Sequence, residues 1–295
     1  MSLRSVTYTA FNLRTHPHTP KTYVELLNDL FMLRKQVHLR GDTYGILSSL
    51  KLLDEAKPLK GMRGEISKFT RIEDGNWLNI QTLQAADEED TQQIVIPEEL
   101  KPNHSSFNFV FYPLSHYLVI ECKDTFGSIS PNYLHTYFRT ALDSDEIEDK
   151  YNKVELTLIP EKNQLKNVLS INNMSLLEIV LRRPNTDGLD ELDEDILDRL
   201  NNQNIAEETI TYKAQKGLSI EADEKTLALS RVAQLNGLVR AKGTDKNGKS
   251  VSLSTVSHPM KVTDRYSTKS TDKISFLLQM GENVVNKIKQ MRLGE

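Results

Sequence analysis

The stretch that most constrains the fold is FNFVFYPLSHYLVIEC, residues 107–122, the longest apolar region of the 295-residue chain. Pro113, Ser115 and His116 interrupt it, so the stretch is too broken to cross a membrane and predicts two strands joined by a turn. A protein with this hairpin at its centre must build a sheet around it.

Helix start signals flank the predicted strands. Thr19-Pro20 and Ser130-Pro131 each combine a capping hydroxyl with a proline that suits the first helical turn. After residue 150, strands and helices alternate without the Gly-rich turn of a dinucleotide-binding fold, and many neighbouring strands read as hairpins. These features predict an α+β fold with mixed or antiparallel sheets, flanking helices and a long C-terminal helix.

The acidic stretch LQAADEEDTQQ, residues 83–93, is the most loop-like segment. It suggests an N-terminal α+β part over residues 1–93 and a second part over residues 94–295, unless the chain forms one continuous domain. The start, MSLRSVTYTAFNL, lacks the apolar segment of a secretory signal, so we expect a cytoplasmic protein that is not itself a membrane protein.

The net charge of −4 conceals a strong asymmetry along the chain. Residues 71–230 carry 14 Lys and Arg against 30 Asp and Glu, whereas residues 231–295 carry 12 against 5. Such segregation predicts either an acidic body with a basic working face or charges that mix once the chain has folded.

GTDKNGKS, residues 243–250, matches the phosphate-binding P-loop pattern. A P-loop needs a helix after it, but VSLSTVSHP follows and reads as a strand. Asn247-Gly248 instead favours a type I′ turn, in which both central residues have positive φ. We therefore interpret the segment as a basic β-hairpin that binds no nucleotide.

This hairpin and the segment that follows it are rich in cations and short hydroxyl side chains. Such groups bind phosphate oxygens without preference for a base. Tyr266 is the only aromatic residue there, so contact with a duplex backbone fits better than base stacking. The candidate nucleic-acid-binding residues are Arg240, Lys242, Lys246, Lys249, Lys261, Arg265 and Lys269. The alternative is an ordinary solvated pair of loops.

The last helix, roughly residues 271–292, carries apolar residues at heptad spacing, interrupted by Gly281. Such a seam suits either a homodimer contact or packing on the protein's own sheet. The candidate dimer-contact residues are Ile274, Leu277, Val284, Ile288 and Met291.

A second hypothesis concerns catalysis. Glu121 and Lys123 end an apolar strand as an E-x-K half motif, and in metal-dependent nucleases such residues hold Mg²⁺ and position the attacking water. The preceding strand supplies no Asp, so half of the motif is missing. His16 and His18 lack an evident third ligand, and Cys122 reads as a small buried side chain. We expect no cofactor, with Mg²⁺ required only if the nuclease hypothesis holds.

Several segments resemble a known family. The hairpin and helix of SFNFVFYPLSHYLVIECKDTFGSISPNYLHTYFRTAL (106–142), then YNKVELTLIP, the ILDRL helix and the basic C-terminal third, follow the order found in RexA, the lambdoid prophage exclusion protein. RRPN-x-D, KGLSIEAD, LNGLVRAKG and STVSHP are also similar to a bacterial family of unknown function associated with phage defence. The resemblance covers roughly residues 60–292 and rests on apolar and turn positions, so it carries no catalytic residue with it.

RexA is a duplex-DNA-binding dimer that acts with a membrane partner. The resemblance therefore implies a DNA-binding component of a phage-defence system, a homodimer and a second defence protein as partner. Our chain departs from this pattern in being net acidic. Three hypotheses stay open: sequence-independent binding of duplex DNA, a Mg²⁺-dependent nuclease, and a protein-interaction component whose acidic body is the working surface.

Overall fold

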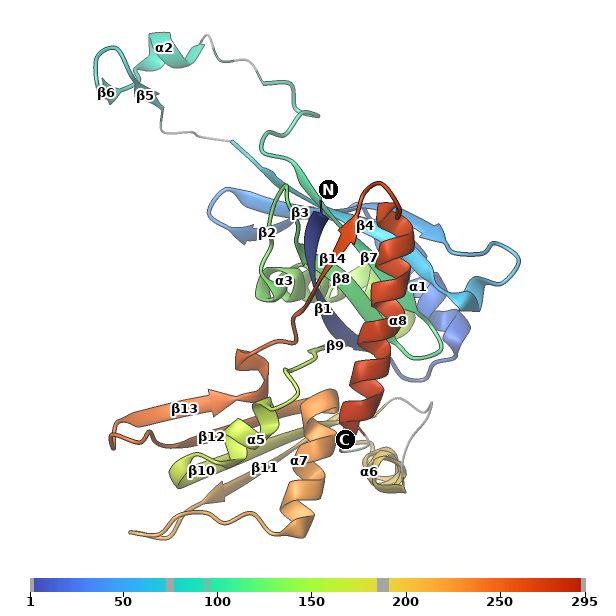
Figure 1. The fold of residues 1–295 in the computed structure, drawn as a ribbon, viewed down its shortest axis with the longest axis vertical. Coiled ribbons are helices and arrows are strands. Elements are labelled where there is room, and N and C mark those ends of the chain that lie inside the picture. Colours follow the sequence, from blue (N-terminus) through green and yellow to red (C-terminus); the bar gives the residue numbers. More distant parts are fainter. Residues whose placement is uncertain (1–2, 73–76, 93, 95, 185–190, 293–295) are drawn as a thin grey trace.

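The computed structural model describes residues 3–72, 77–92, 94, 96–184 and 191–292. Two sheets, one of eight strands and one of four, organise these residues, and helices pack on both (Figure 1). The predicted α+β class is confirmed, together with the flanking helices and the C-terminal helix. Both sheets are antiparallel throughout the described part of the chain.

The large sheet contains β1 (Leu3–Arg14), β2 (Val37–Arg40), β3 (Thr43–Leu52), β4 (Met62–Thr70), β7 (Ser105–Tyr112), β8 (Tyr117–Lys123), β9 (Glu155–Leu158) and β14 (Val262–Ser267). Its order is β14-β1-β8-β7-β4-β3-β2, with β9 paired to β1. The predicted central hairpin is β7 and β8, which pair through Phe109 with Ile120 and Val110 with Val119.

Helices cover both faces of the large sheet. One face packs against α1 (Pro20–Met32), α3 (Pro131–Leu142) and α4 (Asp145–Tyr151), and the other against α8 (Lys273–Arg292). Side chains alternate along a strand, so Phe109 joins the first core and Val110 the second. Because both faces of β7 and β8 are buried, these strands do not show the alternation of apolar and polar residues that a half-exposed strand has.

Helices α1 and α3 begin where their caps predict. The Thr19 hydroxyl accepts a hydrogen bond from the amide of Thr22, and the Ser130 hydroxyl accepts one from the amide of Tyr133. Each satisfies an amide that the first helical turn leaves without a partner.

An excursion leaves the large sheet between β4 and β7. It holds β5 (Leu78–Asn79), β6 (Gln84–Ala85) and α2 (Glu88–Gln92), and Figure 1 shows it projecting from the body. The predicted division after residue 93, a residue outside the described part, falls within this excursion. Because β4 and β7 pair with each other, the two sides of that division belong to one sheet, and a boundary there is wrong.

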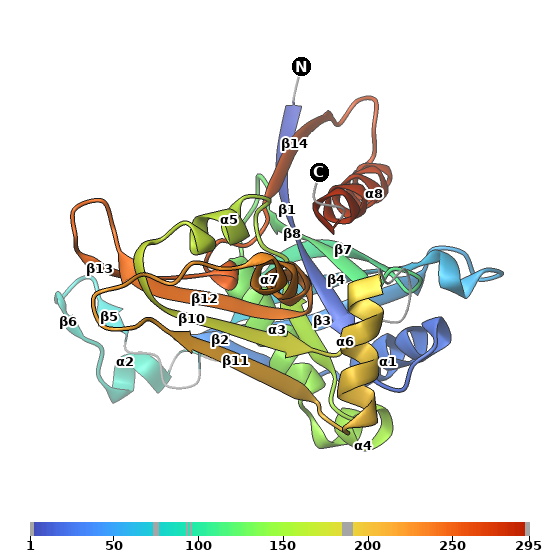
Figure 2. The ribbon, with the colours of Figure 1, turned by 90° about the horizontal axis from the view of Figure 1, so that it is seen from below.

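The small sheet has the order β11-β10-β12-β13 and comprises β10 (Asn172–Arg182), β11 (Glu207–Lys213), β12 (Gly237–Thr244) and β13 (Ser250–Ser254). Helices α5 (Gln164–Leu169), α6 (Glu191–Asn202) and α7 (Glu224–Asn236) bury one of its faces in a third core. Figure 2 shows α5 and α7 on the same side of this sheet. Short 3₁₀ turns lie at Pro58–Lys60 and Thr255–Ser257.

The seam of α8 packs on the protein's own sheet. Leu277, Val284 and Ile288 are fully buried in the core that α8 shares with β1, β7 and β8; Met291 is 8% exposed there, and Ile274 is half-buried. A Cβ added at Gly281 would lie 2.6 Å from Cγ1 of Val110, so the helix and strand approach too closely for any larger residue. The prediction that this seam forms a dimer contact is corrected, because its side chains are already covered within the chain.

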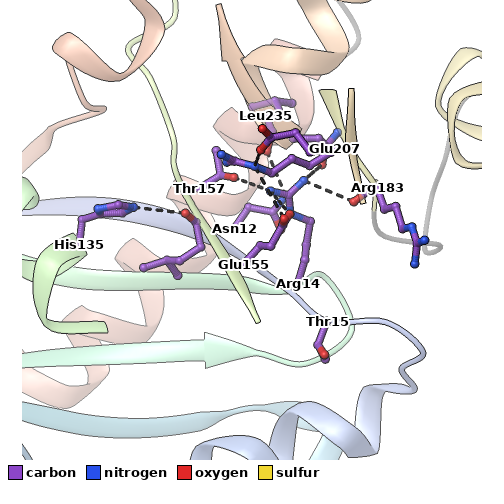
Figure 3. A network of polar contacts seen from close by, with 12 residues as sticks. Asn12, Arg14, Thr15, His135, Glu155, Thr157, Arg183, Glu207 and Leu235 are labelled. Atoms are coloured by element: carbon purple, nitrogen blue, oxygen red, sulfur yellow. Dashed lines mark hydrogen bonds and ion pairs between the residues drawn. The ribbon is translucent and has the colours of Figure 1, made fainter. Parts of the chain in front are cut away.

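A buried polar network joins the two sheets (Figure 3). The fully buried Arg14 of β1 donates hydrogen bonds to the hydroxyl of Thr157 (2.6 Å), the carbonyl of Arg183 (3.4 Å) and the side-chain oxygen of Asn236 (3.4 Å). Its guanidinium lies 3.4 Å from the carboxylate of Glu155. Burial lowers the pKa of Arg14 to about 10, against the opposing effect of the Glu155 charge.

Asn12, two residues earlier on the same strand, adds a second link by donating to the carbonyl of Leu235 (3.2 Å) at the end of α7. The network therefore ties β1 and β9 of the large sheet to β10 and α7 of the small one. We call this network the junction; it comprises Asn12, Arg14, Glu155, Thr157, Arg183, Leu235 and Asn236. It holds the small sheet in its position against the large one.

Candidate nucleic-acid interface

The small sheet presents one covered face and one open face. Leu177, Ile179 and Val239 point toward α5, α6 and α7 and are fully buried. The alternate residues point the other way, and many of them are exposed: Thr209, Thr211, Lys213, Arg240, Lys242, Ser250 and Ser252. At the end near the junction this second face closes, because Val180 there is buried.

Strand register sets which side chains are neighbours on the open face. Leu176 of β10 pairs with Lys213 of β11 on one side and with Lys242 of β12 on the other, and Lys242 pairs in turn with Ser252 of β13. The two lysines therefore flank Leu176 in one row across four strands, about 10 Å apart at two strand spacings. The next row holds Thr211, Glu178 and Arg240.

The hairpin between β12 and β13 extends from one end of this face. Asp245 closes its loop: the carboxylate accepts hydrogen bonds from the amides of Asn247 (2.8 Å) and Lys249 (2.9 Å). Gly248 has φ +78°, while Asn247 does not have a positive φ. A hairpin in place of a P-loop is confirmed, but the two-residue type I′ turn is wrong, because the Asp245 side chain organises a five-residue loop between Thr244 and Ser250.

The basic residues of the interface differ in whether a nearby carboxylate offsets their positive charge. Arg240 lies 3.4 Å from the carboxylate of Glu178, which offsets its charge. Lys213, Lys242, Lys246 and Lys249 have no carboxylate within 4.0 Å in the described residues, and all four are exposed. The open face and the loop thus present four uncompensated cations beside the hydroxyls of Ser250, Ser252, Thr209 and Thr211.

Three of the predicted binding residues lie elsewhere. Lys261 immediately precedes β14, Arg265 lies on it and Lys269 follows it, and β14 is an edge strand of the large sheet. Figures 1 and 2 both show β14 well apart from the tip of the β12–β13 hairpin. The seven predicted residues therefore do not lie together, because the chain returns to the other sheet between Ser254 and Val262.

Lys213 is a residue of this face that the sequence analysis missed. It lies 29 positions before Lys242, and only the pairing of β10 with both β11 and β12 brings the two together. A period-two polar pattern in EETITYK is the one signal in the sequence that this strand has an exposed face.

The E-x-K residues do not form an open metal site. Glu121 is fully buried; one carboxylate oxygen accepts from the backbone and side-chain amides of Asn108 (2.9 and 3.0 Å) and lies 3.0 Å from the Lys273 ammonium. Lys273 also lies 3.4 Å from Asp124, and these carboxylates raise its pKa against the lowering effect of burial.

An ammonium group from α8 therefore stands between the two carboxylates, while Lys123 is exposed at the strand end. The described residues contain no group of three His, Cys, Asp or Glu side chains placed to hold a metal ion.

In the part of the chain that the structure describes, no helix has both the length and the apolar character needed to cross a membrane. Comparison with curated proteins gives no match. Comparison with protein families matches residues 4–282 to a domain of unknown function, DUF4747, and this range includes both sheets, the junction and the first half of α8. The chain belongs to the DUF4747 family.

Proposed function

We propose that this protein binds the backbone of duplex DNA, independently of sequence, through the open face of its small sheet and the adjoining hairpin. The observation that carries the proposal is the row in which Lys213 and Lys242 flank Leu176 on a face without a covering helix. Duplex DNA carries one negative charge per about 1.7 Å of its axis, so cations about 10 Å apart meet separate phosphates.

The chemistry of the face favours phosphates over bases. Exposed hydroxyls from Ser250, Ser252 and Thr211 accompany the lysines, and such groups donate to phosphate oxygens. Tyr212, the single aromatic residue of the four strands, belongs to the covered face, where it packs on the third core. The described open face therefore offers no stacking platform of the kind that single-strand binders use.

The test is fluorescence anisotropy of a labelled 30-base-pair duplex of random sequence, titrated at several salt concentrations without and then with Mg²⁺. Four uncompensated cations predict a slope of log K against log salt of up to about −3.6, since each neutralised phosphate contributes about 0.9. Reversing the charge of Lys246 and Lys249 should bring the slope to about −1.8 or shallower and weaken binding to all duplex sequences alike.

A matched control is the double variant Lys166→Glu/Lys225→Glu. Both residues are exposed on α5 and α7, which cover the opposite face of the same sheet, so the net charge changes equally. Equal weakening by both double variants would mean that only net charge matters and would refute the interface. Loss of signal that depends on Mg²⁺ would instead support the nuclease hypothesis, with Lys123→Ala as its variant.

We also propose, from the resemblance to RexA, that DNA binding serves a phage-defence response carried out with a second protein. Cells that express the protein should lose protection against phage infection when Lys246 and Lys249 are reversed and keep it with the Lys166/Lys225 control. Equal protection of the cells by both variants would mean that defence against phage does not depend on this interface.

One observation favours a protein-interaction function instead. The excursion of residues 77–92 exposes Leu78 (62%), Ile80 (80%) and Leu83 (77%) close to the acidic start of α2. This combination suits a partner with a basic, partly apolar surface. Replacing residues 77–92 with a short Gly-Ser linker should then abolish co-purification of a partner that leaves at high salt, while DNA binding is kept.

A further inference from the structure

A cavity of about 380 Å³ lies where the chain passes between its two sheets. The connection after β9 and the connection before β14 run side by side there: the Met260 amide donates to the carbonyl of Ile159 (2.7 Å), and the Glu161 amide to that of His258 (3.0 Å). The last turns of α8 form the remaining wall. The cavity is thus built from segments that are far apart in the sequence.

Three lysines surround this cavity, one from each segment: Lys162, Lys261 and Lys287. All three are exposed, and none has a carboxylate within 4.0 Å among the described residues. Gln290 adds an amide, and Glu161 is the one acidic residue among the described residues that line the cavity. Cations gathered in this way repel one another, and an anion with two or more charges between them would relieve that repulsion.

The remaining lining is apolar. Met260 and Met291 are buried beneath the lysines, and Val262 lies beside them. Methionine side chains are flexible and polarizable, so they adapt to the face of a ring or to an irregular apolar group. A volume of about 380 Å³ falls in the size range of small-molecule sites, and it is too small for a folded partner.

We propose that this cavity binds a small phosphorylated molecule of nucleotide size, with its phosphates among Lys162, Lys261 and Lys287 and its apolar part against Met260 and Met291. The site is separate from the open face of the small sheet, and the proposal does not depend on DNA binding there. Because the ligand would touch both connections between the sheets and α8, it would also stabilise the folded protein.

The first experiment uses the unmodified protein with ATP and with pyrophosphate as probes. Lysine acetylation followed by mass spectrometry measures how strongly each ligand protects each lysine. ATP should protect Lys162, Lys261 and Lys287 several-fold and leave Lys289 unprotected. Lys289 is the internal control, since it lies on α8 two residues from Lys287 but lines a different cavity.

Calorimetric titration then tests the assignment with Lys261→Glu/Lys287→Glu, and Lys289→Glu serves as the control. The double variant should lose at least ten-fold in ATP affinity, and the control should keep it. Tighter binding of ATP than of pyrophosphate supports the role of the methionines.

Three results would overturn the proposal: no saturable binding of either probe, binding that the double variant retains, or protection at Lys246 and Lys249 in place of the cavity lysines. A thermal melt gives an independent readout, because ATP should raise the melting temperature of the unmodified protein and of Lys289→Glu but not that of the double variant.

Discussion

The two sheets of this protein are built from the same kinds of strand but are covered differently. The large sheet is buried on both faces, by α1 and α3 on one side and α8 on the other. The small sheet is buried on one face only and turns Lys213, Lys242 and Ser252 to solvent on the other. The large sheet thus lies inside the protein, whereas the small one leaves a face uncovered, and the proposed DNA binding depends on that face.

The two kinds of contact between these parts also differ. Apolar side chains fill each sheet's own cores, whereas the junction combines Leu235 of α7, which joins the core of the large sheet, with Arg14, a fully buried cation held by hydrogen bonds. The polar part of the junction favours one geometry, because the two terminal nitrogens of Arg14 find their acceptors in that arrangement. The orientation of the open face thus depends on few residues.

The largest expected effect comes from the junction. Arg14→Ala leaves the carboxylate of Glu155 with Arg182 (3.7 Å) as its remaining partner and should lower the free energy of unfolding by about 3 kcal/mol. Urea denaturation measures this. Lys21→Ala, which removes an exposed ion pair with Glu25, is the control and should leave the value unchanged. A loss under about 1 kcal/mol would contradict a structural role for the junction.

Substitution of Gly281 tests whether the apolar side of α8 packs against the large sheet. On a free helix face Gly281→Ala would stabilise the helix by about 1 kcal/mol. Because a Cβ there meets Val110 at 2.6 Å, we expect a destabilisation of about 2 kcal/mol instead. Gln279→Ala on the exposed side of α8 is the control. An increase in stability for Gly281→Ala would restore the dimer hypothesis, and sedimentation would then show a monomer-dimer equilibrium.

The pH dependence of unfolding probes the loop beside the junction. Burial, and then the charge of His18, lower the pKa of His16 from 6.5 to about 4. Between these values the unfolded chain takes up a proton that the folded one does not, so stability is fully present above pH 6.5 and is lost as the pH falls to 4.

With allowance for solvent screening of the partly exposed ring, the loss should be about 1 kcal/mol. His16→Gln should flatten the unfolding free energy over this window, as urea denaturation at half-unit pH steps can measure. An identical pH slope in both proteins would contradict the assignment to His16.

The smallest effects distinguish the two faces of β13. Leu253 is half-buried against the third core, so Leu253→Ala should cost about 1 kcal/mol of unfolding free energy. Its neighbour Ser252 is exposed on the open face, and Ser252→Ala should change stability by less than about 0.5 kcal/mol. Comparable losses for both variants would mean that the open face is covered.

Features that depend only on neighbouring residues can be read from the sequence. Thr19 and Ser130 mark helix starts because a cap acts on amides two or three positions away. The broken apolar stretch at 107–122 predicts β7 and β8, since side-chain alternation and a turn are local properties. The same local reasoning identifies GTDKNGKS as a hairpin and the last helix as a single long element.

Which of these elements meet depends on long-range packing. Heptad spacing in α8 indicates an apolar seam but not what covers it, and the close approach at Gly281 assigns it to the protein's own sheet. Lys261 follows Lys249 by 12 residues yet stands at the start of a strand of the other sheet, while the more distant Lys213 joins Lys242 through shared pairing with Leu176. Register and sheet membership are set by long-range packing, whose free energy depends on all the faces being buried together, so no short stretch of sequence contains them.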